Sequence, residues 1–249
     1  MVNLIEKYRA MKAAHQRISV LTAYDYPTAR MLDEGGIDII LVGDSVGMVV
    51  LGFPDTTFVT MEHILHHTAA VVRGVKEALV VADLPFGSCE TPADALANSR
   101  RLIEAGAAAV KIEGARIEQI ATIIAAGIPV MGHLGMLPQR VRVEGGYRVK
   151  GKTPEEANEL LEQARAVEAA GAFAVVLELI QPGVAASITE ALDIPTIGIG
   201  SGTDCDGQVL VTHDLIGLFP WFRPRFAKPE ADVSKEIRAA VAAYKKRIE

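Results

Sequence analysis

The sequence has little cysteine, few aromatic residues and no long run of apolar or like-charged residues. Its 249 residues include only two cysteines, Cys89 and Cys205, which lack the close spacing of zinc ligands. Two cysteines without such spacing do not imply a disulfide, so we expect a cytoplasmic protein. The net charge of −6 is spread along the chain, which argues against a nucleic-acid-binding surface. No apolar run approaches the roughly 20 residues of a membrane span, so we expect no membrane association.

The N-terminal segment and the size of the apolar fraction indicate an ordinary globular protein. The first residues, MVNLIEKYRAMKAAHQR, are charged and periodic like a helix, without the hydrophobic segment of a signal peptide. We therefore expect a short N-terminal helix. Half of the residues are hydrophobic, which is enough for a large core. A chain of this length can form two domains, but α/β barrels of this size are usually one, so we expect a single domain over residues 1–249.

Short apolar runs alternate along the chain with longer helical patterns. The runs predict strands at residues 18–24, 37–43, 79–84, 108–113, 128–133, 173–179 and 195–200. Helical patterns lie between them, near residues 27–35, 61–74, 92–105, 116–126, 154–170 and 182–192. Strands that are apolar on both faces and alternate with helices are typical of a parallel α/β architecture. Eight such units predict a (β/α)₈ TIM barrel, and a doubly wound open sheet is the alternative.

The eighth strand is ambiguous in the sequence. The segment GQVLVTHDLIGLF, residues 207–219, contains the helically spaced VTHDLIGL and is therefore expected to be a helix. The last strand is then expected at RFAK, residues 225–228, followed by a helix from Pro229 to Ile248.

Two connections are long, at residues 43–60 and 134–153. The second contains the glycine-rich, charged stretch EGGYRVKGK. Loops of this length and composition often close over an active site as a lid, and a mobile surface loop is the alternative.

Polar side chains occur where successive predicted strands end, which is the end that carries the active site of a barrel. These residues are Asp25, Asp44 with Ser45, Asp83, Lys111 with Glu113, His133 and Glu178. Any one of them could be a helix cap or an ion-pair partner, and for Asp25 a cap is as good an interpretation as a supporting role behind the site. Clustered carboxylates repel each other unless a cation neutralises them. Oxygen ligands of this kind favour Mg²⁺.

Other residues allow more than one interpretation. Lys111 and Glu113 lie two residues apart and face the same side of one strand, so Lys111 could bind an anionic substrate or form a Schiff base. His63, His66 and His67 lie on a predicted helix away from the strand ends, and we expect a structural role for them. The turn GIGSG, residues 198–202, is typical both of phosphate-binding loops and of tight packing.

Ten segments of the sequence match, in order, a family of known proteins. They are LTAYDYPTA, LVGDSVGMVVLG, HHTAAVVRG, ADLPFGS, AGAAAVKIEG, GIPVMGHLG, GGYRVKG, EAAGAFAVVLE, IPTIGIGSG and DGQVLVTHD. On these segments the chain resembles the ketopantoate hydroxymethyltransferases along nearly its whole length. The resemblance implies a barrel of the phosphoenolpyruvate mutase and isocitrate lyase type.

The resemblance also implies an activity, a metal and site residues. The expected reaction transfers a hydroxymethyl group from 5,10-methylenetetrahydrofolate to 3-methyl-2-oxobutanoate through a Mg²⁺-stabilised enolate. The family's Mg²⁺ ligands, one ion per subunit, fall on Asp44, Asp83 and Glu113. Its substrate-binding residues fall on Ser45, Asp83, Lys111 and His133, and its catalytic base falls on Glu178. A homo-oligomer is implied, usually a decamer.

The chain departs from the family pattern at a few positions. It has Met136 and Leu137 in GHLGMLPQ where the family reads GHLGLTPQ, Ser201 in place of an alanine, and Gln163 in place of an aspartate. Two other functions use the same residues. One is a Mg²⁺-dependent carbon–carbon lyase of a 2-oxo or 2-hydroxy acid, and the other is a ketoacid-binding protein without catalysis.

Overall fold

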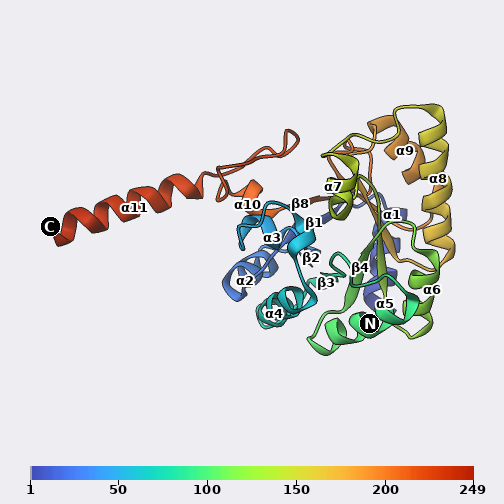
Figure 1. Cartoon of the computed structure of the whole chain (residues 1–249), viewed down its shortest axis with the longest axis horizontal. Helices are drawn as coiled ribbons and strands as arrows, with labels where there is room; N and C mark the ends of the chain where they lie inside the picture. Colours follow the sequence, from blue (N-terminus) through green and yellow to red (C-terminus); the bar gives the residue numbers. More distant parts are fainter. Residues whose placement is uncertain (1) are drawn as a thin grey trace. The chain divides into compact units, whose positions relative to one another are not determined.

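The computed structural model describes the backbone of residues 2–249 and the side chains from residue 6 onward, and its strands form a closed barrel (Figure 1). The strands are β1 Ile18–Thr22, β2 Ile39–Val42, β3 Leu79–Asp83, β4 Ala109–Glu113, β5 Val130–Gly135, β6 Ala174–Glu178, β7 Thr196–Ile199 and β8 Gly207–Leu210. Strands that are consecutive in the chain are neighbours in the barrel, and their pairing is parallel. The predicted (β/α)₈ barrel is confirmed, and the doubly wound sheet was the wrong alternative.

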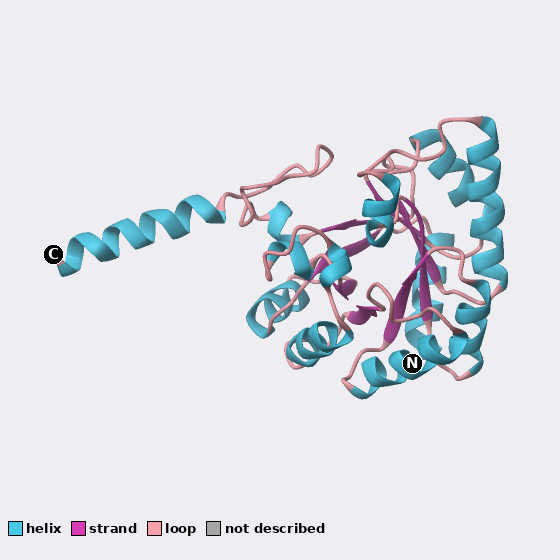
Figure 2. Cartoon of the chain, viewed as in Figure 1, coloured by secondary structure: helices cyan, strands magenta, loops and turns pink. Residues whose placement is uncertain are grey.

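Helices connect the strands and surround them, as Figure 2 shows for the cyan helices outside the magenta strands. The helices of the described residues are α1 Val2–Ala13, α2 Tyr26–Glu34, α3 Val46–Val49, α4 Met61–Val72, α5 Pro92–Glu104, α6 Ile117–Ala125, α7 Val141–Glu144, α8 Pro154–Ala169, α9 Pro182–Ala191, α10 Thr212–Leu215 and α11 Val233–Ile248. Those that connect the strands β1 to β7 are α2 to α9. Two 3₁₀ turns, η1 Thr56–Phe58 and η2 Pro138–Arg140, lie in the long connections. The side chains of Thr91 and Thr153 accept a backbone hydrogen bond at the start of α5 and α8, where a proline follows each of them.

The strands alternate between two apolar layers. Residues such as Ile40 and Val110 pack outward against the helices, whereas Ile39, Val81 and Val176 form a second cluster inside the barrel. Because both faces of a strand are buried, the strands read in the sequence as continuous apolar runs. Every residue of β2, β3, β4 and β6 is buried.

The eighth strand corrects the sequence-based expectation. Residues 207–210 form β8, only residues 212–215 form a helical turn, and RFAK at 225–228 is not a strand. Prolines at positions 224 and 229 flank RFAK, and proline cannot donate a ladder hydrogen bond. Gly207 suits the position of β8, because a Cβ there would lie 2.4 Å from the carbonyl oxygen of Ile18. The last helix, α11, begins at Val233 rather than Pro229.

The chain divides into two compact units, Met1–Val209 and Leu210–Glu249. The first contains nearly all of the barrel, and the second contains α10 and α11. A single domain over residues 1–249 stays a prediction.

Cys89 and Cys205 are buried free thiols. Within the described residues, no helix combines the length and the apolar character that a membrane crossing requires.

Candidate active site

Six polar side chains meet at the carboxyl ends of strands β2 to β6, and we call them the strand-end cluster. They are Asp44, Asp83, Lys111, Glu113, His133 and Glu178, each no more than 8 % exposed. The alternation of the strands explains their position, because Asp83, Lys111 and Glu178 fall in the same alternating series as the residues inside the barrel. The apolar interior of the barrel therefore gives way to charged groups at its mouth.

Lys111 is the cation of the strand-end cluster. The strand register places it beside Asp83, and its Nζ lies 3.1 Å from Asp83 Oδ1 and 3.2 Å from His133 Nδ1. Burial lowers the pKa of Lys111, but the facing carboxylates of Asp83 and Glu113 outweigh that effect and raise the pKa above its ordinary value. A Schiff base requires a neutral amine, so this environment suits an anion-binding ammonium rather than a Schiff-base lysine.

His133 lies between the ammonium of Lys111 and the carboxylate of Glu178. Its Nδ1 faces Lys111, and its Nε2 lies 3.2 Å from Glu178 Oε2. Burial, reinforced by Lys111, keeps the pKa of His133 well below its ordinary value, so the ring is neutral. An ammonium can only donate, so Nδ1 must be the unprotonated nitrogen. The ring proton then resides on Nε2, which lies near Glu178 but forms no hydrogen bond within the described residues.

Glu178 is the last residue of β6, and its surroundings suit a general base. Burial raises its pKa to about 8, against the opposing charge of Lys111. The turn that follows it is tight, because Leu179 has a positive φ of 46°. Gly135 on β5 has to be glycine, since its φ is +95° and a Cβ there would lie 2.2 Å from the carbonyl oxygen of Glu178.

Asp44 and Asp83 lie together where β2 and β3 end. The backbone N–H of Asp44 donates to Asp83 Oδ2 at 2.9 Å. A Cβ at Gly43 would lie 3.0 Å from Ser45 Oγ and 3.6 Å from that same Asp83 oxygen, which explains the glycine before Asp44. Burial, followed by the charge of Asp83, raises the pKa of Asp44 to about 7. The pKa of Glu113 lies well above its usual range, because of burial and then Asp44.

The strand-end cluster has an excess of negative charge that fits a hard divalent cation. It holds four carboxylates and one ammonium, and the buried Glu113 Oε1 accepts no hydrogen bond. Among the described side chains, no three His, Cys, Asp or Glu residues are arranged to hold one metal ion. Mg²⁺ is commonly bound through one or two carboxylates, with water and substrate as its other ligands. The donors therefore fit Mg²⁺, and the complete ligand set Asp44, Asp83 and Glu113 stays a prediction.

The remaining predicted residues lie around the strand-end cluster or away from it. Ser45 is half-buried, and its Oγ lies 2.7 Å from the hydroxyl of the buried Tyr24. Asp25 is exposed and accepts hydrogen bonds from Thr28 as the N-cap of α2, which confirms the cap, and a role behind the site stays a prediction. Ser201 of the GIGSG turn is buried, and its Oγ binds the protein's own backbone.

His63 and His67 bind the protein's own backbone, while a structural role for His66 stays a prediction. His63 forms a capping box with Thr60 at the start of α4. The Nδ1 of His67 lies 2.6 Å from the carbonyl oxygen of Tyr24. Neither ring belongs to the strand-end cluster.

Two residues near the cluster were not predicted from the sequence. Gln139 of η2 is buried and donates to Asp44, and partial burial, followed by the charges of Glu178 and Asp44, raises the pKa of Tyr147. Both lie in the long connection after β5, where neither strand alternation nor helical periodicity indicates which side chains turn inward.

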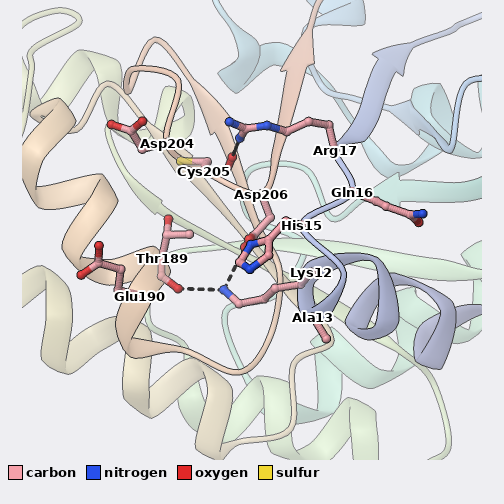
Figure 3. Close-up of a pocket in the computed structure, with 10 residues that line it drawn as sticks. All are labelled: Lys12, Ala13, His15, Gln16, Arg17, Thr189, Glu190, Asp204, Cys205 and Asp206. Atoms are coloured by element: carbon pink, nitrogen blue, oxygen red, sulfur yellow. Dashed lines mark hydrogen bonds and ion pairs between the residues drawn. The ribbon is translucent and has the colours of Figure 1, made fainter.

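A separate pocket of about 460 Å³ lies where the strands begin, lined by residues before β1 and β8 and by Thr189 and Glu190 of α9 (Figure 3). Lys12 crosses it and donates to Asp206 Oδ2 at 2.9 Å and to the carbonyl oxygen of Thr189 at 2.7 Å. Arg17 donates to the carbonyl oxygen of Cys205. The cations of this pocket are bound by the protein itself, which indicates a structural role, as is general for this end of a barrel.

Comparison with known proteins relates the chain to one enzyme family. A family model described as ketopantoate hydroxymethyltransferase matches residues 3–249. A relative from Acetivibrio thermocellus, a 3-methyl-2-oxobutanoate hydroxymethyltransferase, is 54 % identical over 94 % of this chain and 84 % of its own.

Solved structures support the barrel type. Phosphoenolpyruvate phosphomutase from Streptomyces platensis subsp. rosaceus aligns with a TM-score of 0.67 at 18 % identity, covering 98 % of this chain and 87 % of its own. 2,3-Dimethylmalate lyase, a member of the PEP mutase/isocitrate lyase superfamily, aligns with a TM-score of 0.63 at 16 % identity, covering 98 % of this chain and 87 % of its own. At these identities the likeness concerns the fold alone.

Proposed function

The chain belongs to the ketopantoate hydroxymethyltransferase family and is an enzyme of that type, and we propose that its donor is 5,10-methylenetetrahydrofolate and its acceptor 3-methyl-2-oxobutanoate. With water, these substrates give 2-dehydropantoate and tetrahydrofolate, a step toward pantothenate. The observation that carries the proposal is the buried Glu178, whose pKa of about 8 and contact with neutral His133 suit removal of a weakly acidic C–H proton.

The acceptor is an anion, and the strand-end cluster offers it one ammonium and a half-buried hydroxyl. Lys111 would neutralise the substrate carboxylate, and the hydroxyl of Ser45, held by Tyr24, would donate to it. Asp44, Asp83 and Glu113 would hold Mg²⁺, with one ion per subunit. When bound, Mg²⁺ supplies positive charge to the keto oxygen of the substrate as a Lewis acid.

Glu178 then takes the proton from C3 of the acceptor. A carboxylate with a raised pKa is a stronger base than an ordinary one, so the transfer to it is less unfavourable. His133 Nε2 lies 3.2 Å from Glu178 Oε2, and with its N–H turned toward that oxygen it would fix the direction of the carboxylate. Carbon C3 forms the new bond to the methylene carbon, and the two bonds from that carbon to N5 and N10 of the folate break. Water supplies the hydroxyl group, and the two folate nitrogens take up one proton from that water and the proton removed from C3.

The carbon nucleophile has to be kept from solvent protons, and the two long connections support a lid. Arg142 in α7 forms an ion pair with Asp55 at 2.8 Å, and its guanidinium carbon lies 4.3 Å from the centre of the Phe58 ring. The hydroxyl of Tyr147 lies 3.8 Å from Met48 Sδ. The connections after β2 and β5 thus hold each other beside the strand-end cluster, where a lid would exclude water.

The proposal is tested by proton NMR of 3-methyl-2-oxobutanoate in D₂O with the protein, with and without Mg²⁺. We expect the C3 proton to exchange only with Mg²⁺ present and only when residue 178 is glutamate, with Glu178→Gln as the inactive control. Adding methylenetetrahydrofolate should then yield 2-dehydropantoate. Absence of exchange both with and without folate contradicts the proposal, and cleavage of a 2-hydroxy dicarboxylate without folate would favour the lyase.

A further inference from the structure

Gln139 is a buried side chain at the strand-end cluster for which the proposed reaction has no role. It lies in η2, the 3₁₀ turn that follows β5, and is 8 % exposed, whereas the next residue, Arg140, is exposed. A buried primary amide needs hydrogen-bond partners, and the partners of Gln139 indicate its role.

The donors of Gln139 reach the ends of three successive strands. Its side-chain Nε2 donates to Asp44 Oδ2 at 2.9 Å and to the carbonyl oxygen of Leu84 at 3.0 Å. Its backbone N–H donates to Glu113 Oε2 at 3.2 Å. Asp44 follows β2, Leu84 follows β3 and Glu113 ends β4, so one residue fixes the separation and the rotation of two predicted metal ligands.

Gln139 binds only one oxygen of each carboxylate, Oδ2 of Asp44 and Oε2 of Glu113. The second oxygen of each carboxylate makes no bond to Gln139. Glu113 Oε1 in particular accepts no hydrogen bond although it is buried. We propose that Gln139 is a positioning residue for the divalent cation, which holds Asp44 and Glu113 so that the second oxygen of each remains available to the ion. This inference rests on the proposed function, because it assumes a divalent cation at these two carboxylates.

A purely structural role for Gln139 makes a different prediction. If the side chain only fills space beneath the lid connection, methionine, which has a similar shape, should serve equally well for cation binding. If its amide positions Asp44, loss of the amide should weaken cation binding, because groups that orient metal ligands typically change metal affinity by about 10- to 100-fold. The backbone N–H that reaches Glu113 is the same in both variants, so the substitution tests the contact with Asp44.

The experiment is a titration of the full-length protein with Mn²⁺, followed by the electron paramagnetic resonance signal of the free ion. We expect the Kd for Mn²⁺ to rise at least about tenfold in Gln139→Met. The matched control is Gln163→Met on α8, whose amide also donates to a carboxylate, that of Glu159 at 3.0 Å, and which should keep the wild-type Kd. In an Asp44→Asn background, Gln139→Met should cause no comparable further loss, since its main carboxylate partner has gone.

Each outcome decides between the possibilities. An unchanged Kd in Gln139→Met overturns the inference and leaves the proposed function standing. Mn²⁺ binding that depends on Gln139, without C3 proton exchange, supports the inference while the proposed function fails. If the wild type binds no Mn²⁺, both the inference about Gln139 and the proposed function are contradicted. Should Gln139→Met lack the wild-type circular dichroism spectrum, Gln139→Asn, whose amide is one methylene short of Asp44, takes its place with the same expected loss.

Discussion

Burial acts in opposite directions on the two titratable side chains that meet at the end of β6. It raises the pKa of Glu178 to about 8, because the charged carboxylate loses hydration, and it lowers that of His133, because the charged ring loses hydration. At neutral pH the histidine is therefore a hydrogen-bond donor of fixed tautomer and not a second proton acceptor. The acid–base assignment follows from this separation of the two pKa values.

The first prediction is the pH dependence of C3 proton exchange. Glu178 has to be deprotonated to act, so the exchange rate should rise with pH and level off once pH exceeds its pKa, at or below about 8 when a bound cation adds positive charge. The measurement is the initial exchange rate between pH 5.5 and 9 with Mg²⁺ present. A rate that falls over this range would require the base to be a different group.

Ser201 shows what one departure from the family pattern contributes. Its Oγ donates to the carbonyl oxygen of Leu177 at 2.8 Å and accepts from the backbone N–H of Ile180 at 2.9 Å, so it holds the backbone on both sides of Glu178. Ser201→Ala should lower the free energy of unfolding by about 1–3 kcal/mol, because Ile180 N–H loses its partner in a buried position. Urea unfolding of Ser201→Ala and of the wild type measures this difference in the free energy of unfolding.

The control for Ser201 is Ser187→Ala on α9, whose hydroxyl donates to the carbonyl oxygen of Gly183 at an exposed position. Water can replace that bond, so the unfolding midpoint should stay near the wild-type value. Equal destabilisation in the two variants would contradict the assigned role of Ser201.

At the residue scale, the polar residues of the site that lie on strands can be predicted from the sequence, whereas those that lie in loops cannot. Asp83, Lys111 and Glu178 are found because strand alternation assigns them to the barrel interior, where a charge is unusual. Gln139 follows a strand by several residues within an irregular turn, so no periodicity indicates that it turns inward. Its position depends on how η2 folds back over β2 to β4, which is tertiary information.

At the scale of elements, α1 is attached to the barrel at the end opposite the strand-end cluster. Tyr8 donates to the carbonyl oxygen of Asp38, and Lys12 reaches Asp206, which also accepts from Thr196 N at 2.8 Å. Lys12→Met should lower the free energy of unfolding by about 1–3 kcal/mol, because a hydrogen bond to a largely buried charge is lost.

Urea unfolding of Lys12→Met is compared with that of Arg30→Met, which removes an exposed ion pair to Glu34 within α2. The Arg30 variant should unfold at the wild-type midpoint, since exposed pairs contribute little. If the two variants behave alike, α1 does not stabilise the barrel through Lys12.

The contact between the two long connections is a second feature at this scale. Arg142→Ala removes both the ion pair with Asp55 and the contact with Phe58, so residues 145–152 should become several-fold more sensitive to trypsin at Arg148, Lys150 and Lys152. Cleavage is followed by mass spectrometry, with Arg165→Ala on α8 as the control that removes an exposed ion pair to Glu162. Unchanged cleavage in Arg142→Ala would mean that this contact does not hold the loop.

Most elements follow from the sequence because their burial produces a clear pattern. The predicted strand at 79–84 corresponds to β3, Leu79–Asp83, and the predicted helix at 92–105 to α5, Pro92–Glu104. The prediction of the eighth strand is wrong because Gly207–Leu210 has one partly exposed face and precedes a helically spaced segment. Its identity as a strand depends on closing the barrel, which no local pattern encodes.

At the scale of the whole molecule, helix α11 offers a surface for the subunit contact of the predicted homo-oligomer. No residue of this 16-residue helix is buried, yet Ile237, Val241, Tyr244 and Ile248 are spaced by four, three and four residues along one face. An apolar stripe of this kind is normally covered in a soluble protein. We propose that a second copy of the chain covers it, because the family resemblance implies a homo-oligomer and self-association through one surface requires no other partner.

The double variant Ile237→Glu/Tyr244→Glu should therefore shift the molar mass, measured by light scattering, from an oligomer toward the 26.6 kDa of one chain. Ala239→Glu/Ala242→Glu adds the same two charges on the opposite face of α11 and should leave the oligomer intact. Dissociation in both variants would indicate charge repulsion rather than loss of the apolar contact. An unchanged mass in the first variant would place the subunit contact on another surface of the chain.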